Sequence, residues 1–159
     1  MTDQNPVVHK LGIADIKVVA RPDTIRTVLG SCVGIAMYDR VAGIGGMAHV
    51  ILPSAEGGKG ARGKFADTAI DQLIDDLLRE GSHRARLAAK IAGGASMFGT
   101  SVDDSLGDRN AEAVRQRLAH HSIRLAAEHL GGTRGRRMLL SPSDGRVEVQ
   151  IIGEEVSVL

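Results

Sequence analysis

The chain lacks most of the residues on which disulfide, metal and nucleic-acid chemistry depend. Its 159 residues include one cysteine, one tyrosine, two phenylalanines and no tryptophan. A single cysteine cannot form a disulfide within the chain, and no cluster of cysteine and histidine has the spacing of a zinc site. The net charge of +1 and the scarcity of aromatic side chains argue against nucleic-acid binding. We therefore expect no metal, no cofactor and no nucleic-acid partner.

Long apolar runs are also missing. No segment approaches the roughly 18 apolar residues that a membrane-spanning helix needs, and the N-terminal residues lack the apolar stretch of a signal peptide. The sequence therefore predicts a cytoplasmic protein without membrane insertion. In a reducing compartment Cys32 is a free thiol, and such a thiol is either buried and inert or reactive.

The residues that are present predict one α+β domain over residues 1–159. Apolar residues make up 43% of the chain, which is ordinary for a globular domain, and the 20 glycines predict many tight turns. Strands outnumber helices without regular alternation, which indicates a mixed or antiparallel sheet covered by helices. Strands are expected over 7–13, 16–20, 31–38, 44–52, 87–92, 123–130, 137–141 and 146–152, and helices over about 67–81 and 110–121.

Local residue types predict how several of these elements begin and end. Asp67 is expected to cap the start of the first helix, and Asp108 or Asn110 the start of the second. Residues 54–63 are rich in glycine and charge without periodicity, so we expect a mobile loop that could gate substrate entry. The basic cluster Arg134, Arg136 and Arg137 is expected to lie in a solvated loop.

The first predicted hairpin brings Cys32 towards His49. If Tyr38 and Gly43 close the turn symmetrically, Cys32 and His49 lie directly opposite each other. Opposed residues share one face of the hairpin and hold their Cβ atoms about 4.5 to 5.5 Å apart. A slip of one residue or a single bulge would place them on opposite faces, so this pairing depends on the register.

A thiol beside an imidazole is a candidate nucleophile and base. A neighbouring imidazolium lowers the thiol pKa, and the thiolate then attacks a carbonyl carbon to form a thioester. The imidazole needs a partner on its other nitrogen, for which Thr27 is the nearest candidate, with Asp39 and Asp67 as alternatives. Backbone N–H groups are expected to stabilise the oxyanion. They belong to the segment that contains Gly30, Ser31 and Cys32.

Spacing alone does not decide between this reading and a structural one, because a lone cysteine on an apolar strand is usually a small core residue. Six segments in a fixed order change that balance, and together they resemble the chemoreceptor glutamine deamidase family, CheD. The segments are 27–33 (TVLGSCV), 46–53 (GMAHVILP), 64–70 (KFADTAI), 89–98 (AKIAGGASMF), 107–110 (GDRN) and 131–136 (GGTRGR).

The resemblance implies a cysteine hydrolase that converts receptor glutamines to glutamates with release of ammonia. Cys32 would be its nucleophile, His49 its base and Thr27 its third catalytic residue. The implied fold has a β-sandwich-like core flanked by helices, similar to deamidating bacterial toxins. The implied partners are the cytoplasmic helical bundle of chemotaxis receptors and, in some bacteria, a response-regulator phosphatase.

Two departures from the family pattern and two other functions stay open at this point. The distance between threonine and cysteine varies within the family, which leaves Thr24 as an alternative to Thr27. His129 stands where an acidic residue is expected. The protein could also be a non-catalytic regulator that binds receptors or the phosphatase, or an enzyme that uses the same thioester chiefly as a methylesterase or an amine transferase.

Overall fold

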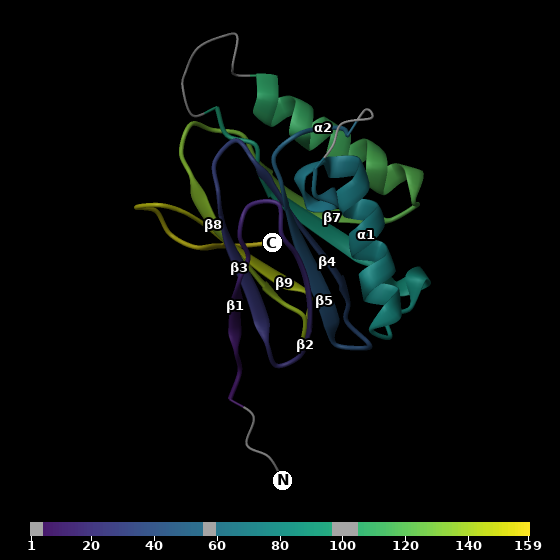
Figure 1. Cartoon of the computed structure of the whole chain (residues 1–159). Helices are drawn as coiled ribbons and strands as arrows, with labels where there is room; N and C mark the ends of the chain where they lie inside the picture. The colour runs from purple at the N-terminus through teal and green to yellow at the C-terminus, as the bar shows by residue number, and fades with distance from the viewer. Residues whose placement is uncertain (1–4, 56–59, 97–104) are drawn as a thin grey trace.

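A computed structural model describes residues 5–55, 60–96 and 105–159. In these residues, ten strands form two five-stranded sheets that pack face to face (Figure 1). The first sheet, sheet A, has the order β1 (Val8–Lys10), β3 (Thr24–Leu29), β8 (Arg136–Ser141), β9 (Arg146–Ile151) and β10 (Ser157–Val158). The second, sheet B, has the order β2 (Ile16–Ala20), β5 (Ile44–Val50), β4 (Val33–Asp39), β6 (Ala88–Gly93) and β7 (Arg124–Leu130).

The sheets are mixed. β1 pairs in parallel with β3, and β6 pairs in parallel with β7, whereas the remaining strand pairs are antiparallel. The helices α1 (Ala66–Arg79) and α2 (Ser105–His120) cover the face of sheet B that points away from sheet A (Figure 1). Two short 3-10 helices, η1 (Arg62–Lys64) and η2 (Arg84–Arg86), flank α1. The expectation of a strand-rich core flanked by helices is confirmed.

Strand β4 lies at the centre of the molecule and is buried on both faces. Ile35 and Met37 pack in the core between sheet B and the helices, whereas Ala36 and Tyr38 pack in the core between the sheets. A strand with two apolar environments has no polar face, which explains why the sequence there is apolar without alternation.

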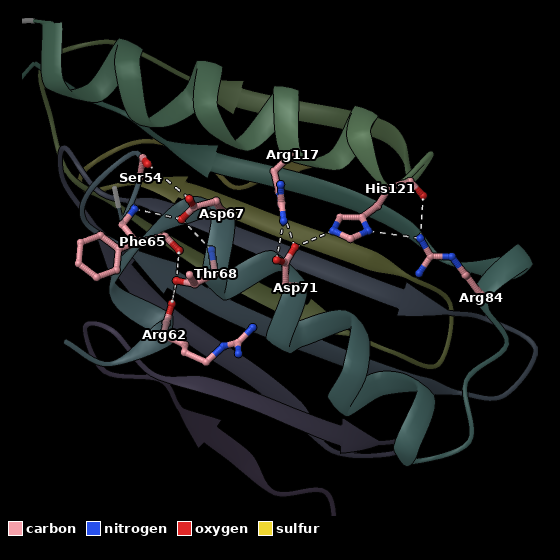
Figure 2. Close-up of polar contacts among 10 residues, drawn as sticks. Ser54, Arg62, Phe65, Asp67, Thr68, Asp71, Arg84, Arg117 and His121 are labelled. Carbon is pink, nitrogen blue, oxygen red and sulfur yellow. Dashed lines mark hydrogen bonds and ion pairs between the residues drawn. The ribbon is translucent and has the colours of Figure 1, made fainter. Parts of the chain in front are cut away.

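Helix α1 is held against α2 by one carboxylate. Asp71 on α1 accepts two hydrogen bonds from the Arg117 guanidinium, at 2.8 and 2.6 Å, and His121 Nε2 lies 2.6 Å from the same carboxylate (Figure 2). The Arg84 guanidinium in turn donates to the His121 carbonyl oxygen at 3.0 Å. These contacts join both helices to the segment that leads into β6.

Several predicted boundaries were wrong. The sequence did not predict β3, which carries exposed and buried residues in alternation. The predicted cap, Asp67, lies inside the first turn of α1. The residue that precedes the helix is Phe65, which forms no side-chain cap. The Asp67 carboxylate instead accepts hydrogen bonds from the Ser54 hydroxyl and from the N–H groups of Ala55 and Thr68 (Figure 2).

The second predicted cap was also wrong, since α2 begins at Ser105 and contains both Asp108 and Asn110. Part of the predicted loop at 54–63 lies outside the described residues, and so does the segment 97–104. In the described residues, neither helix is long and apolar enough to cross a membrane.

Candidate active site

Two residues from opposite sheets meet in the core between them. His49, on β5 and 2% exposed, has its Nδ1 atom 2.8 Å from the Oγ1 atom of Thr27 on β3. The Thr27 hydroxyl also donates a hydrogen bond to the Leu11 carbonyl oxygen at 2.9 Å. A hydroxyl has only one proton to donate. Thr27 must therefore accept from His49, which places the imidazole proton on Nδ1.

This arrangement leaves Nε2 of neutral His49 with a free lone pair. The Nε2 atom is buried and has no hydrogen-bond partner among the described residues. An imidazole whose Nδ1–H is engaged and whose Nε2 is unpaired has the tautomer that a general base needs. Thr27 is thus in contact with the imidazole nitrogen for which the sequence predicted a partner, and its catalytic role stays a prediction.

The predicted alternatives to Thr27 do not contact His49. Asp39 lies at the other end of β4, where it pairs with Arg86, and Asp67 binds Ser54 as described above. The Thr24 hydroxyl is buried and has no hydrogen-bond partner among the described residues.

Cys32 does not lie directly opposite His49, so the predicted register was wrong. The residue that pairs with His49 is Gly34, and Cys32 precedes it by two positions in the bend before β4. Residues two apart on a strand point to the same face. Consistent with this, Cys32 packs against the core between the sheets, which is the side on which His49 meets Thr27. The two residues therefore share a face as diagonal neighbours, and no hydrogen bond joins the Cys32 sulfur to His49 within the described contacts.

Burial disfavours the charged form of both groups. Burial raises the pKa of the Cys32 thiol, and burial lowers the pKa of His49, an effect that the Asp15 carboxylate offsets only in part. The sequence instead predicted an imidazolium that lowers the thiol pKa. The structure therefore favours a resting thiol beside a neutral base, in which proton transfer accompanies attack on the substrate.

Backbone contacts fix the segment that carries the cysteine. Gly94 N–H donates to the Cys32 carbonyl oxygen at 2.9 Å, and Ala95 N–H donates to the Gly30 carbonyl oxygen at 3.0 Å. Gly93 has a φ of +113°, and a Cβ at that position would lie 2.2 Å from the Cys32 carbonyl oxygen. Only glycine allows the end of β6 to approach so closely.

Donors from neighbouring elements occupy the carbonyl oxygens of this segment. Asn110 Nδ2 holds the third carbonyl oxygen, that of Ser31, at 3.3 Å. Outside the helices and strands, the described backbone–backbone hydrogen bonds do not involve the N–H groups of Gly30, Ser31 or Cys32, and the Cys32 N–H interacts with its own sulfur. N–H groups beside a thiol can stabilise an oxyanion.

Sequence reasoning missed the role of Asn110. This residue is fully buried, and its Nδ2 also donates to the Ile51 carbonyl oxygen at 3.1 Å, so α2 holds the cysteine segment against the end of β5. A signal was present in the sequence, because Asn110 stands four residues before Val114 and eight before Leu118, on the apolar face of the helix. A polar residue on such a face is expected to find a buried partner.

Arg136 is not in a solvated loop, as the sequence had predicted, but 1% exposed at the start of β8. Its guanidinium lies 2.8 Å from His129 Nδ1 and donates to the carbonyl oxygens of His129 and Gly131. Burial lowers the pKa of this arginine. Ser96 N–H donates to the Gly132 carbonyl oxygen at 2.8 Å. The turn after β7, which Arg136 holds, therefore also contacts the residues after β6 that bind the cysteine segment. His129 therefore contacts a cation at the position where an acidic residue was expected.

In the described part of the chain, no group of three or more histidine, cysteine, aspartate or glutamate side chains could hold a metal ion. The chemistry that these residues support is attack by a thiol on a carbonyl carbon, assisted by a neutral imidazole and by backbone donors.

The family model and the relatives found by sequence identify the same family. The family model described as CheD chemotactic sensory transduction matches residues 51–151, a range that begins after Thr27, Cys32 and His49. A probable chemoreceptor glutamine deamidase CheD of Symbiobacterium thermophilum is 46% identical over 151 residues, which cover 90% of this chain and 92% of that protein. The chemoreceptor glutamine deamidase CheD of Halalkalibacterium halodurans is 44% identical over 152 residues, covering 91% and 94%. Among solved structures, the Bacillus licheniformis hypothetical protein YfiH superposes with a TM-score of 0.47 at 20% identity, over 80% of this chain and 61% of that one.

Proposed function

The chain belongs to the CheD family, and from this premise we propose that it hydrolyses the side-chain amide of glutamine residues on chemotaxis receptors, releasing ammonia and leaving glutamate. The observation that carries the proposal is the hydrogen bond from His49 Nδ1 to Thr27, which leaves Nε2 as a buried base on the face that Cys32 shares. Cys32 is the sole cysteine of the chain, so no other thiol could act as the nucleophile.

In the first half of the reaction, the Cys32 sulfur attacks the amide carbon while its proton passes to His49 Nε2. The N–H groups of the segment from Gly30 to Cys32 stabilise the resulting oxyanion. His49 then gives its proton to the amide nitrogen, the carbon–nitrogen bond breaks, and ammonia leaves a thioester behind.

In the second half, water attacks the thioester carbon and His49 accepts the proton of the water. The carbon–sulfur bond breaks, the thiol regains its proton, and the substrate leaves as glutamate. The net reaction consumes one water and one amide and yields one carboxylate and one ammonium ion. In this mechanism, Cys32, His49 and the backbone N–H groups supply the protein groups of the reaction, and water is the second substrate.

The same proposal includes four narrower features. The whole chain, 1–159, acts as one deamidase domain. The protein acts in the cytoplasm. Its fold is similar to that of deamidating bacterial toxins. A response-regulator phosphatase binds it in addition to the receptor.

Mass spectrometry of a receptor fragment tests the reaction. Incubation with the protein should add about 1 Da for each glutamine converted to glutamate, and Cys32→Ala should abolish this gain, because no other thiol can form the thioester. His49→Ala should lower the rate by at least about 100-fold. The matched control is His120→Ala, which removes an exposed histidine of α2 and should leave the rate unchanged.

A fully active Cys32→Ala protein would contradict the mechanism. If instead the receptor fragment binds but gains no mass, the protein is a regulator and not an enzyme. Ester hydrolysis without amide hydrolysis on a methylated and amidated fragment would identify a methylesterase.

A further inference from the structure

In the part of the chain that the structure describes, no helix covers the outer face of sheet A. Both described helices lie on sheet B, on the far side from sheet A (Figure 1). Nine large apolar side chains are exposed in the described residues, and four of them line one groove on this outer face: Val8, Ile13, Val28 and Val156, each at least half exposed. A cluster of exposed apolar side chains rimmed by polar ones is typical of a protein-binding surface.

The groove has a volume of about 730 Å³ and reaches the candidate active site. Its walls come from β1, β3, β8 and β9, and Thr27 and His49 belong to its lining. The groove reaches Thr27 and His49 because β1 is short. It pairs with β3 only from Thr24 to Arg26, and the chain turns away at Leu11. The part of β3 that follows Arg26, next to His49, is therefore not covered by β1.

The groove also runs towards the segment that carries the nucleophile. At one end of the groove, Val28 pairs with Arg137, and the next pair along the two strands is Leu29 with Arg136. Leu29 leads directly into Gly30, Ser31 and Cys32. A chain that lies in the groove thus reaches Thr27 and His49, and it ends near the strand that leads to Cys32.

The charges of the groove select the kind of chain that fits. Lys10, Arg26 and Arg137 are exposed, and in the described residues none of them forms an ion pair. The acidic residue of the lining, Glu148, lies 3.8 Å from the guanidinium of Arg146. Three unpaired cations between apolar side chains form a surface complementary to a segment that is both acidic and apolar.

We propose that this groove is the docking surface for the receptor substrate, and that it takes an acidic, amphipathic segment of the receptor that carries the target glutamine. The inference rests on the proposed function for the identity of the partner. The apolar side chains of the groove contact the apolar face of that segment, and the three cations pair with its carboxylates. Each deamidation adds a carboxylate to the segment, so the product keeps the charge that the groove recognises.

Charge reversal tests the electrostatic part of the proposal. The double variant Arg26→Glu/Arg137→Glu, made on the Cys32→Ala background so that no chemistry occurs, is titrated with the fluorescently labelled cytoplasmic domain of a cognate receptor. We expect the Kd at about 50 mM salt to rise at least about tenfold, because attraction is replaced by repulsion. The difference should shrink at about 300 mM salt, where exposed charges are screened.

The matched control is Arg40→Glu/Arg124→Glu, which changes the net charge by the same amount. Both of these arginines are exposed and form no ion pair in the described residues, and they lie at the end of sheet B opposite to Cys32. We expect this variant to change the Kd less than about threefold. If both double variants weaken binding equally, the receptor is attracted by overall charge and the docking proposal is overturned.

A neutral substitution tests the apolar part. Val28→Ser removes apolar surface without changing charge and should raise the Kd by about three- to tenfold at both salt concentrations. Val41→Ser, in the turn after β4, removes a comparably exposed valine and should leave the Kd unchanged. A Kd that is insensitive to all groove variants overturns the proposal.

The deamidation assay separates this failure from failure of the proposed function. If wild-type protein adds no mass to the receptor domain while the groove variants still weaken binding, the docking surface stands and the enzyme assignment falls. If the wild-type protein deamidates the receptor domain and the groove variants bind it normally, the enzyme assignment stands and the substrate docks elsewhere.

Discussion

A single hydroxyl decides the chemistry available to His49. The Thr27 hydroxyl donates its one proton to the Leu11 carbonyl oxygen, so it can only accept a hydrogen bond from the imidazole. Many enzymes orient the histidine with a carboxylate, which also stabilises the imidazolium by its charge. A neutral acceptor orients the ring without that charge. This agrees with the lowered pKa of His49, because burial disfavours the imidazolium and Thr27 adds no compensating negative charge.

Substitution of Thr27 should therefore affect catalysis through the tautomer. In Thr27→Val the Nδ1 proton loses its acceptor, and we expect the rate at saturating receptor to fall about 100-fold, less than the roughly 10⁴-fold seen when a triad carboxylate is replaced. The Leu11 carbonyl oxygen also loses its donor, so the free energy of unfolding should fall by about 1 to 3 kcal/mol. Deamidation kinetics and urea unfolding measure the two effects separately.

Thr27→Ser is the matched control, since it keeps the hydroxyl and removes only a methyl group. It should retain most of the activity, and ¹⁵N spectra of His49 should show the Nδ1–H tautomer in the wild type and in Thr27→Ser but a mixture in Thr27→Val. Equal rates for the valine and serine variants would show that Thr27 has only a structural role.

At the scale of elements, the cysteine segment is positioned by its neighbours and not by its own strand. Cys32 lies in a bend, and three donors hold the carbonyl oxygens of that bend from the end of β6 and from α2. Hydrogen bonds to its carbonyl oxygens make this segment rigid. The approach of β6 is the closest of these contacts, and it depends on Gly93.

Gly93→Ala should displace the nucleophile. The new methyl group would overlap the Cys32 carbonyl oxygen, and an alanine at a φ of +113° is strained as well. We expect a loss of at least about 10²-fold in deamidation rate, because a displacement near 1 Å suffices for that effect. Receptor deamidation and alkylation of Cys32 by iodoacetamide measure it.

Gly153→Ala provides the comparison for backbone strain alone. Gly153 has a φ of +91°, and a Cβ there would meet no atom within 4 Å. This variant should lose stability of about 1 kcal/mol and keep its activity. If Gly93→Ala behaved like Gly153→Ala in both assays, contact with the Cys32 carbonyl oxygen would not matter for catalysis.

At the scale of the whole molecule, one buried carboxylate contributes to stability in acid. Asp39 is fully buried, and its two oxygens accept from the Arg86 guanidinium at 2.9 Å, from His83 N–H at 2.8 Å and from two N–H groups of the turn between β4 and β5. Burial opposes ionisation, but the hydrogen bonds from Arg86 and from the backbone prevail and lower the pKa of Asp39 to about 2.

Because the pKa of Asp39 is lower in the folded state than its ordinary value, ionised Asp39 stabilises the fold above about pH 4. This contribution, on the order of 2 kcal/mol, should be lost as the pH falls from about 4 to about 2. Asp39→Asn should therefore be less stable than the wild type at pH 7, and the difference should narrow over that acidic range. Urea unfolding at several pH values measures it.

Asp75→Asn serves as the control for this experiment. Asp75 is exposed on α1, so its removal should change neither the stability at pH 7 nor its acid dependence. A difference between wild type and Asp39→Asn that stayed constant from pH 7 to pH 2 would show that Asp39 stabilises the fold by shape and not by its charge.

The sequence by itself predicted the class of the fold and the members of the site. Alternating and continuous apolar runs predicted most strands and both helices, because burial imposes periodicity on the residues of each element. The single cysteine, the histidine and the threonine were identified from residue chemistry, hairpin geometry and the ordered family segments. Strand β3 was missed because exposed valine and buried threonine break the expected correspondence between polarity and burial.

The contacts between elements were decided by the tertiary structure. Asp39 accepts hydrogen bonds from Val41 and Ala42 N–H groups and, with the φ of +67° at Gly43, closes the hairpin at Asp39 and Ile44 instead of at Tyr38 and Gly43. Each side of the hairpin thus moves by one residue. That shift keeps Cys32 and His49 on one face, since side chains alternate with a period of two, but makes them diagonal.

Sequence patterns record what each residue prefers locally, so they determined that this chain has a thiol, an imidazole and a hydroxyl on elements that fold together. The proton on Nδ1, the burial of Arg136 and the hold of Asn110 on the cysteine segment depend on partners far away in the chain. Because such contacts are fixed only when the two sheets and the helices pack, only the tertiary structure decided them.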